Sequence, residues 1–456
     1  MLSHSLLRVV LASALVTLLS ACASLPADVA RTESRTLSNT GDTRLGQGVG
    51  ELTKTHPGKS GVRALPEAKE AFAARILLAR GAQRSLDLQY YIWHSDTTGQ
   101  LLWEEVWRAA ERGVRVRVLL DDANTGGQDG MLATLDAHPS VELRLFNPFA
   151  NRSFRAGDFL GDFKRVNHRM HNKSFTADNQ VAIVGGRNIG DEYFGANMEV
   201  GFQDLDVMTV GPVVSEVSDE FDLFWNSASA YPGASLLPPS ASDGPGQLQV
   251  SWEANRSRQE AREYIEETSR TPLVAQVMQG KLDFEWTTAH VLHDDPGKAL
   301  QPIDRTDLHM LPRLEAALGR PDRELDLVSP YFVPGKEGTA GLSALAKRGV
   351  KVRVLTNSLS ATDVAPVHAG YAKYRKELLE AGITLFELKP GVAVPPPDKE
   401  GRPHGLPGSG STGGGSAASL HAKTFAADRK RIFVGSFNLD PRSAQLNTEM
   451  GVVIDS

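Results

Sequence analysis

Hydrophobic positions after residue 65 alternate between helical and strand spacing. Residues 67–83 place Ala, Phe, Ile and Leu at helical intervals, and helical spacing returns over 100–112 and 126–137. The runs between and after these segments, rich in Val, Leu and Tyr, predict strands at 86–93, 114–120 and 141–146. This alternation predicts an α/β fold built on a largely parallel or mixed sheet.

The same series occurs a second time along the chain. LDLVSPYF (325–332) corresponds to LDLQYYIW (86–93), and RGVKVRVL (348–355) repeats RGVRVRVL (112–119) almost letter for letter. ITLFELKP (383–390) likewise matches VELRLFNP. The order is kept while the loops differ, which indicates an internal duplication. We therefore expect two tandem α-β-α halves packed about a pseudo-twofold axis around one shared active site.

Composition shifts predict where the halves begin and end. The first half is expected over 65–231, and the Pro-, Ser- and Gly-rich residues 232–250 are predicted to link it to a second half over 251–456. A second low-complexity stretch, at about 391–419, predicts a mobile insertion. Because it lies beside a motif described below, a lid over the site is the alternative.

The N-terminal residues have a different character. Residues 5–21 are apolar apart from Arg8 and end at Leu19-Ser20-Ala21-Cys22, which resembles the lipobox of bacterial lipoproteins. This predicts a signal peptide over 1–22 with lipid attached to Cys22, and residues 23–64 as a flexible tether. An ordinary secretory signal or short anchor with an incidental Cys is the alternative. The lipobox interpretation implies a membrane-anchored protein on the periplasmic side, with inner and outer membrane both open.

Overall composition narrows the classes of function. The chain is 41% hydrophobic and 23% charged, which is typical of a globular protein. Its formal net charge of −6 argues against a general nucleic-acid binder. Cys22 is the single cysteine, so an internal disulfide and a Cys-based zinc site are excluded. No metal or cofactor is expected.

Each half carries one copy of the pattern H-x-K-x4-D, followed by a short strand, a Gly step and an Asn. The first copy is HNKSFTAD (171–178) and the second is HAKTFAAD (421–428). Two copies with the same downstream spacing exclude coincidence. The candidate site residues are His171, Lys173, Asp178 and Asn188 in the first copy, and His421, Lys423, Asp428, Ser436 and Asn438 in the second.

The residue types suit chemistry on a phosphate diester. A neutral imidazole is a nucleophile, and a Lys two residues along the same strand face supplies positive charge to an anionic phosphoryl group. Two facing copies provide one His to attack phosphorus and another to protonate the leaving oxygen. Lysines, asparagines and Ser436 are expected to hold the phosphate, whereas Asp178 and Asp428, within the same catalytic motifs, are expected to brace the fold through turn hydrogen bonds.

The paired motifs resemble those of the phospholipase D superfamily. The surrounding text over residues 65–456 is similar to bacterial cardiolipin synthases of the C type, as in RMHNKSFTADNQVAIVGGRNIGDEYFG and ASLHAKTFAADRKRIFVGSFNLDPRS. The resemblance implies a phosphatidyl transferase that works through a covalent phosphohistidine, with His171 as nucleophile and His421 as acid and base. It also implies an acidic residue orienting each motif His, for which Asp206 and Glu449 are the matches in the first and second copies.

The implied partners are membrane phospholipids, with phosphatidylglycerol as substrate and phosphatidylethanolamine as a second candidate. A nuclease of the same superfamily is the alternative enzyme, and a duplicated scaffold with inactive sites is the non-enzymatic one. The intact His, Lys and Asn residues in both copies weigh against an inactive scaffold.

Overall fold

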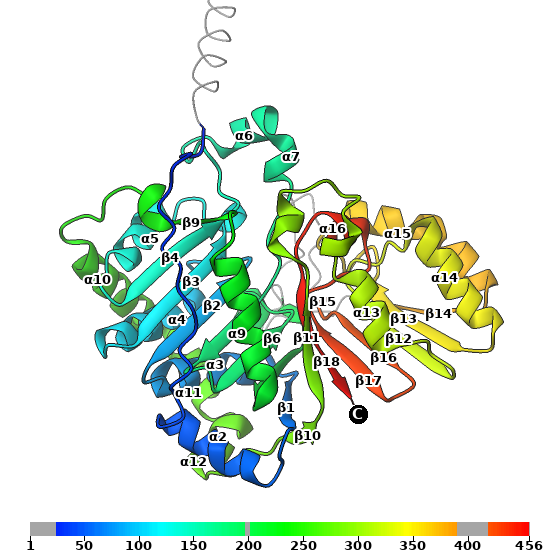
Figure 1. Cartoon of the computed structure of the whole chain (residues 1–456), viewed down its shortest axis with the longest axis horizontal. Coiled ribbons are helices and arrows are strands. Elements are labelled where there is room, and N and C mark those ends of the chain that lie inside the picture. The colour runs from blue at the N-terminus through cyan, green and yellow to red at the C-terminus, as the bar shows by residue number, and fades with distance from the viewer. Residues whose placement is uncertain (1–23, 197–200, 390–417, 456) are drawn as a thin grey trace, which may run out of the picture.

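The computed structural model describes residues 24–196, 201–389 and 418–455, and two mixed β-sheets dominate it (Figure 1). Within these residues the first sheet has nine strands in the order β10-β1-β8-β6-β5-β2-β3-β4-β9 and the second has seven, in the order β11-β18-β17-β16-β12-β13-β14. The first sheet comprises β1 (Ser60–Leu65), β2 (Ser85–Tyr90), β3 (Arg115–Asp121), β4 (Val141–Phe146), β5 (Ser174–Ala177), β6 (Val181–Gly185), β8 (Asp206–Val210), β9 (Ala230–Pro232) and β10 (Glu285–Thr287). The second comprises β11 (Ala289–His293), β12 (Glu324–Val328), β13 (Lys351–Asn357), β14 (Thr384–Leu388), β16 (Thr424–Ala427), β17 (Arg431–Gly435) and β18 (Met450–Asp455).

The strand pairings repeat from one half to the other. In the first half β2-β3-β4 are parallel, while β5, β6, β8 and β1 follow in antiparallel fashion. In the second half β12-β13-β14 are parallel, and β16, β17, β18 and β11 repeat the antiparallel series. The predicted duplicated α/β architecture is therefore confirmed.

Helices cover both sheets, and the strands alternate in the faces that they bury. Val116, Val118 and Leu120 of β3 pack in the core under α3 and α4, whereas Leu119 packs on the opposite face with Phe221 of α9. The longer helices are α2 (Arg44–Lys54), α3 (Ala68–Gly81), α4 (Thr97–Glu111), α5 (Asp129–Asp136), α9 (Pro212–Trp225), α10 (Gly244–Ser257), α11 (Gln259–Ser269), α13 (Leu311–Leu318), α14 (Gly335–Lys347) and α15 (Ala365–Glu380). The shorter ones are α6 (Arg155–Gly161), α7 (Phe163–Val166), α8 (Asp191–Phe194), α12 (Pro272–Met278) and α16 (Pro441–Gln445).

The two halves meet directly. Only Thr288 separates β10 of the first sheet from β11 of the second. An apolar cluster shared by both sheets includes Val184 and Val207 on one side and Met450 and Val452 on the other. A further two-stranded parallel sheet pairs β7 (Gly201–Gln203) with β15 (Ala418–Leu420), so one strand from each half forms it.

The predicted tether at 23–64 differs from the structure. Strand β1 lies inside the first sheet and α2 precedes it. Residues before α2 accept hydrogen bonds from buried arginines: Arg117 donates to the Ser34 carbonyl at 3.0 Å and Arg144 to the Thr32 carbonyl at 2.5 Å. A segment rich in Ser and Thr is ordered here because its backbone supplies acceptors to buried guanidinium groups.

The predicted start of the second half at residue 251 is too early. Helices α10, α11 and α12 pack on α3, α4 and α5, and Trp252 and Tyr264 belong to the core of the first half. The second sheet begins only at Ala289. The predicted mobile insertion at about 391–419 lies outside the described residues, apart from its last two positions in β15, and Cys22 also lies outside them.

Candidate active site

Both motif histidines lie where one half pairs with the other. His171 lies three residues before the start of β5, and its backbone N–H donates to the Thr448 carbonyl at 2.8 Å. His421 occupies the equivalent place before β16, and its N–H donates to the Gln203 carbonyl at 2.7 Å. The duplicated fold thus brings together two histidines that are 250 residues apart in sequence.

Each histidine is held by a carboxylate from the opposite half. His171 Nδ1 lies 2.8 Å from Glu449 Oε2, and His421 Nδ1 lies 2.5 Å from Asp204 Oδ2. All four residues are buried. A carboxylate on Nδ1 fixes the ring orientation and the tautomer, and it leaves Nε2 as the reactive nitrogen.

The assignment of Asp206 as a histidine-orienting residue is wrong. Its carboxylate instead accepts from Arg75 Nη2 at 2.9 Å, in a buried pair that joins β8 to α3. Asp204, two residues earlier, makes the histidine contact. The pairing is also crossed between the halves, so Glu449 orients the histidine of the first copy rather than that of its own.

The two lysines occupy buried positions beside the histidines. Lys173 Nζ and Lys423 Nζ each donate to the carbonyl of their own motif His, and Lys423 Nζ also lies 2.9 Å from His421 Nδ1. Lys173 Nζ lies 5.5 Å from the centre of the Tyr91 ring. The site therefore places two lysine side chains next to two imidazoles.

Aromatic rings flank both imidazoles. The Tyr91 ring meets His171 edge-on at 5.2 Å, and Tyr193 meets His421 in the same way at 5.2 Å. Phe202 of β7 stacks on His421 at 5.0 Å. These contacts restrict ring rotation and reduce the polarity around the reacting nitrogens.

Burial and charge set the protonation of the site. Burial, followed by the charges of Lys173 and Lys423, lowers the pKa of His171 well below its ordinary value. Burial and Lys423 also lower the pKa of His421, but Asp204 opposes that shift. Burial lowers the pKa of Lys173 strongly and that of Lys423 to about 8. Both imidazoles are therefore neutral without substrate.

The two carboxylates are unequal. Burial raises the pKa of Glu449 to about 7, against the opposing charge of Lys173. Burial of Asp204 acts in the same direction, but the neighbouring His421 and Lys423 outweigh it and hold the Asp204 pKa below its ordinary range. Asp204 therefore stays ionised to lower pH than Glu449, and the pKa of His421 is lowered less than that of His171.

Asp178 and Asp428 lie on turns away from the histidines, with positive φ angles of 51° and 54°. The Asp178 carboxylate accepts from the backbone N–H groups of Gln83, Arg84 and Ser85 at 2.7–3.1 Å. Asp428 accepts in the same way from the N–H groups of residues 322–324 at 2.8–2.9 Å. Both brace the start of a neighbouring strand, as the turn interpretation expects.

The predicted phosphate-binding residues are buried close to the motif strands. Asn188 accepts from the Ile92 N–H at 3.2 Å and donates to the Tyr193 hydroxyl at 3.0 Å. The Asn438 amide oxygen is buried with no hydrogen-bond partner among the described residues. The Ser436 hydroxyl donates to Glu449 Oε2 at 2.5 Å.

The Gly186 position explains why the two copies differ. A Cβ atom there would lie 2.2 Å from Asp204 Oδ1, so only Gly fits beside that carboxylate. The counterpart position holds Ser436, whose hydroxyl occupies a bonding site on Glu449. Ser436 therefore belongs to the support of His171, and its predicted contact with phosphate stays a prediction.

A second buried network supports His171 from behind. The Asn172 amide donates to Glu220 Oε1 at 2.7 Å, and its oxygen accepts from the Thr448 hydroxyl at 2.9 Å. Gln89 also donates to Glu220 Oε1, at 3.3 Å. Burial raises the pKa of Glu220 to about 8. This network ties Thr448, which precedes Glu449, to the segment that carries His171.

Comparison with known proteins was consistent with this geometry. Residues 76–225 and 314–456 match the family model described as "Cardiolipin synthase, PLD-like domain". Cardiolipin synthase C of Escherichia coli (strain K12) is 47% identical over 416 residues, which cover 91% of this chain and 85% of that protein. Cardiolipin synthase A of Pseudomonas syringae pv. syringae (strain B728a) is 26% identical and aligns with 87% of this chain and 65% of its own length.

A solved structure shares the fold. Phosphatidylserine synthase of Haemophilus influenzae Rd KW20 superposes with a TM-score of 0.56 at 14% identity, covering 90% of this chain and 87% of that chain. Across residues 24–196, 201–389 and 418–455, no group of three or more His, Cys, Asp or Glu side chains is placed to hold a metal ion. The match to both halves and the identity over most of the length show that this chain belongs to the cardiolipin synthase family of phospholipase D-like proteins.

Proposed function

We propose that the chain is a phosphatidyltransferase that makes cardiolipin from phosphatidylglycerol and a second phospholipid through a covalent phosphohistidine. One observation carries the proposal: two buried histidines, each fixed through Nδ1 by a carboxylate from the opposite half, stand beside two buried lysines. Membership of the cardiolipin synthase family supports the lipid substrate class.

The reaction divides between the two histidines. His171 Nε2 attacks phosphorus of the donor lipid, and the bond from phosphorus to the head-group oxygen breaks while His421 donates a proton to that oxygen. A hydroxyl of the acceptor lipid then loses its proton to His421 and attacks the phosphohistidine, which breaks the N–P bond and frees His171. The two lysines stabilise charge on the non-bridging oxygens.

The unequal environments support this order of roles. His171, whose pKa is lowered furthest, stays neutral and nucleophilic. His421 has a firmly ionised partner in Asp204, and the charge of a bound phosphate diester raises its pKa further, which suits a residue that must carry a proton. Excluding water from the intermediate favours transfer over hydrolysis, and the aromatic rings of Tyr91, Tyr193 and Phe202 contribute to that exclusion.

Anchoring is a further part of the proposal. The lipobox-like Leu19-Ser20-Ala21-Cys22 supports a bacterial lipoprotein attached to a membrane through acylated Cys22, with its catalytic body on the periplasmic side. None of the helices in the described part of the chain is long and apolar enough to cross a membrane. Acyl labelling of wild type and of Cys22→Ser, followed by separation of inner and outer membranes, tests this part.

The activity is tested with the purified full-length protein on vesicles of phosphatidylglycerol, with and without phosphatidylethanolamine. Mass spectrometry of the lipids should detect cardiolipin, and release of free glycerol should accompany transfer between two phosphatidylglycerol molecules. His171→Ala and His421→Ala should abolish product. His290→Ala is the matched control, because His290 is exposed on β11 and its side chain pairs with Glu216, away from the motif histidines.

Plasmid DNA incubated under the same conditions tests the nuclease alternative. Cleaved DNA with unchanged lipids would overturn the proposal, and so would wild-type product from His421→Ala. Phosphatidic acid in place of cardiolipin would identify a hydrolase that uses the same site.

A further inference from the structure

Helices α6 and α7 form a small projection with an unusual surface. We call residues 154–166 the α6–α7 tip. Leu160 is 89% exposed, Phe163 59%, Phe154 50% and Phe159 43%. Three of the four exposed phenylalanines in the described residues lie in this tip. Soluble surfaces rarely gather so many apolar side chains in one place without a partner.

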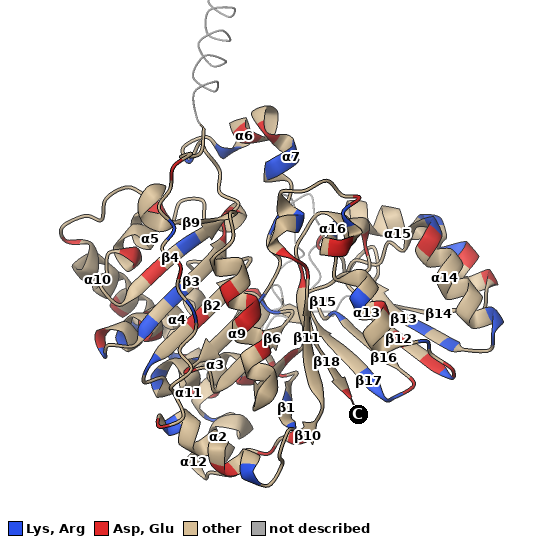
Figure 2. Cartoon of the chain, viewed as in Figure 1, with Lys and Arg blue, Asp and Glu red and all other residues tan. Residues whose placement is uncertain are grey.

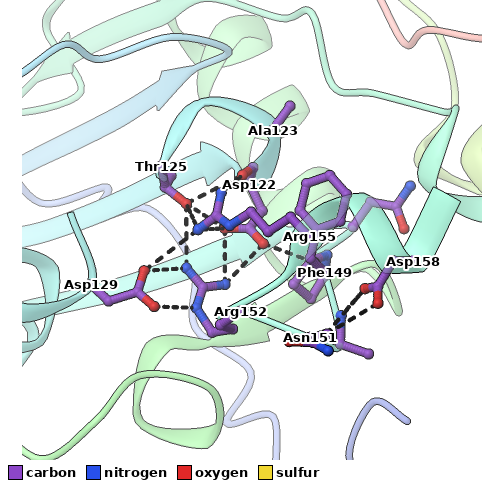
Figure 3. Close-up of polar contacts among 12 residues, drawn as sticks. Asp122, Ala123, Thr125, Asp129, Phe149, Asn151, Arg152, Arg155 and Asp158 are labelled. Atoms are coloured by element: carbon purple, nitrogen blue, oxygen red, sulfur yellow. Dashed lines mark hydrogen bonds and ion pairs between the residues drawn. The ribbon is translucent and has the colours of Figure 1, made fainter. Parts of the chain in front are cut away.

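Ion pairs and hydrogen bonds around the buried Asp122 support the tip (Figure 3). Arg152 bridges Asp122 at 2.9 Å and Asp129 at 2.5 Å, and Arg155 donates to the Asp122 carbonyl at 2.7 Å and to the Thr125 hydroxyl at 2.9 Å. These contacts hold the start of α6 on the end of β3. A preformed support lowers the entropy lost when the apolar side chains bind a partner.

The base of α6 is fixed separately. The Asp158 carboxylate accepts from the backbone N–H groups of Ala150 and Asn151 at 2.5–3.3 Å. The Phe159 ring then packs between Phe149 at 5.7 Å and Phe163 at 6.4 Å. Apolar rings therefore run continuously from the buried Phe149 to the exposed end of the tip.

The tip lies at the same end of the molecule as the start of the described chain (Figure 1). Contacts connect the two: Arg31 donates to the Ala230 carbonyl at 3.1 Å, Asn147 donates its N–H to the Ser229 carbonyl at 2.8 Å, and the Asn147 amide donates to the Arg165 carbonyl at 2.8 Å. The apolar residues 5–21 and Cys22 lie just before this start in the sequence. The described chain therefore starts at the end of the molecule that carries the tip.

The other side of the tip connects to the active site. Residues 167–170 join α7 to His171, and Arg442 of α16 donates to the Asn167 side chain at 2.8 Å. The His168 ring contacts the Leu446 carbonyl at 2.9 Å. The tip thus stands at the junction of the two halves, beside the segment that carries His171, the proposed nucleophile.

We propose that the α6–α7 tip inserts its exposed Phe and Leu side chains into the surface of a phospholipid bilayer and so seats the active site on its lipid substrate. That the bilayer lipid is the substrate rests on the proposed function, whereas insertion of the tip does not. A convex projection of four apolar residues suits the acyl boundary of a bilayer, where Phe and Leu are favoured. Figure 2 shows charged residues of both signs on α6 and α7, so the apolar side chains, not a basic surface, should supply most of the binding.

Insertion is tested with a fluorescent probe on the full-length protein. Because Cys22 is the single cysteine, a Cys22→Ser chain with Leu160→Cys carries one label, and Cys22→Ser with Met278→Cys is the matched control. Met278 is also highly exposed, at 79%, but lies on α12 at the opposite end. On vesicles of phosphatidylglycerol and phosphatidylethanolamine, an environment-sensitive label at 160 should shift to the blue and be quenched by brominated acyl chains, while the label at 278 should not.

Three results would overturn the inference. Equal quenching at both positions, or quenching at neither, would show that the tip does not insert. A blue shift that grows with protein concentration without vesicles would show that the tip binds a second copy of the chain. Loss of quenching at about 0.5 M salt would show that charge, not apolar insertion, holds the tip on the membrane.

A kinetic measurement separates this inference from the activity. Leu160→Ser with Phe163→Ser should lower kcat/KM on vesicles by about tenfold or more and leave kcat/KM on micellar substrate unchanged. An equal loss on both substrates would overturn the inference. If the label at 160 inserts but neither the wild type nor any variant transfers phosphatidyl groups, the proposed function is wrong. The inference that the tip inserts into the bilayer would still hold.

Discussion

Replacing Glu449 with Gln removes the negative charge beside His171 and keeps the shape of the side chain. Glu449 Oε2 lies 2.8 Å from His171 Nδ1 and 2.5 Å from Ser436 Oγ, and Gln can still accept from both. A hydrogen bond to a charged group contributes about 1.5–3 kcal/mol and a neutral one about 0.5–1.5 kcal/mol. The phosphohistidine carries positive charge on its ring, so its formation should lose about 1–2 kcal/mol of stabilisation and slow roughly 5- to 30-fold.

A substrate with a p-nitrophenol head group isolates this step. Its leaving group needs no proton, so attack by His171 no longer depends on His421, and stopped-flow release of p-nitrophenolate reports formation of the phosphohistidine. Glu449→Gln should slow the first, rapid release of p-nitrophenolate (the burst) by the same roughly 5- to 30-fold. Asp204→Asn removes charge from beside His421, so it should leave the burst near the wild-type rate and slow the later turnovers, in which the acceptor hydroxyl must be deprotonated.

The crossed pairing makes the comparison decisive. If each carboxylate served the histidine of its own half, Glu449→Gln would spare the burst and Asp204→Asn would slow it. That result would refute the assigned roles. A burst of normal rate in both variants would refute the view that the carboxylates act on the transferred charge at all.

Three further predictions concern pH and stability. Burial raises the pKa of Glu449 to about 7 and lowers that of Lys423 to about 8. On short-chain lipid, kcat/KM should therefore rise with pH as Glu449 ionises and fall again as Lys423 loses its proton. In Glu449→Gln the rise on the acid side should disappear. Asp178→Ala leaves three backbone N–H groups unpaired and should lower the free energy of unfolding, measured in urea melts, by about 2–4 kcal/mol. Asp428→Ala should lower it less, because Asp428 is more exposed than Asp178. A large loss of kcat in folded Asp178→Ala would contradict a purely structural role. Burial raises the pKa of Glu220 to about 8, so the native state holds a proton that the unfolded state releases. The free energy of unfolding should therefore fall as pH rises from 5 to 8. Glu220→Gln should flatten that slope, and an unchanged slope would contradict a protonated Glu220.

The parts of the site that repeat could be predicted from sequence. His171 and His421 stand out because the whole pattern around them occurs twice, and the spacing of two residues predicts a Lys beside each His, although these residues lie just before their strands. The turn role of Asp178 followed from its place after a strand. Such inferences need only local geometry.

Contacts between the halves could not be predicted in the same way. Asp204 and Asp206 are two residues apart, so in an extended chain their side chains face the same way, and the strand period offers no choice between them. The ladders supply it: Gly185 pairs with Asp206 and Gly435 with Gly451, so Asp206 corresponds to Gly451 and Asp204 to Glu449. This register is a property of the structure, since Asp204 follows Gly185 by 19 residues and Glu449 follows Gly435 by 14, so aligning the copies on these glycines does not select Asp204.

The boundary between the halves could not be predicted for a related reason. The described residues of the second half contain no counterpart of helices α10 to α12, so the duplication gives no information about these helices. Their apolar positions, such as Trp252 and Tyr264, indicate burial but not against which half.

The exchange of carboxylates between halves makes the molecule resemble a dimer fused into one chain, in which the subunit interface and the catalytic centre are the same place. Neither half is a complete enzyme, since each has a histidine and lacks the anion that orients it. A small separation of the two sheets would break both histidine–carboxylate bonds at once. Turnover therefore reports on the docking of the halves as directly as on the chemistry, and it should be lost at the first loosening of the shared apolar cluster, before either sheet unfolds.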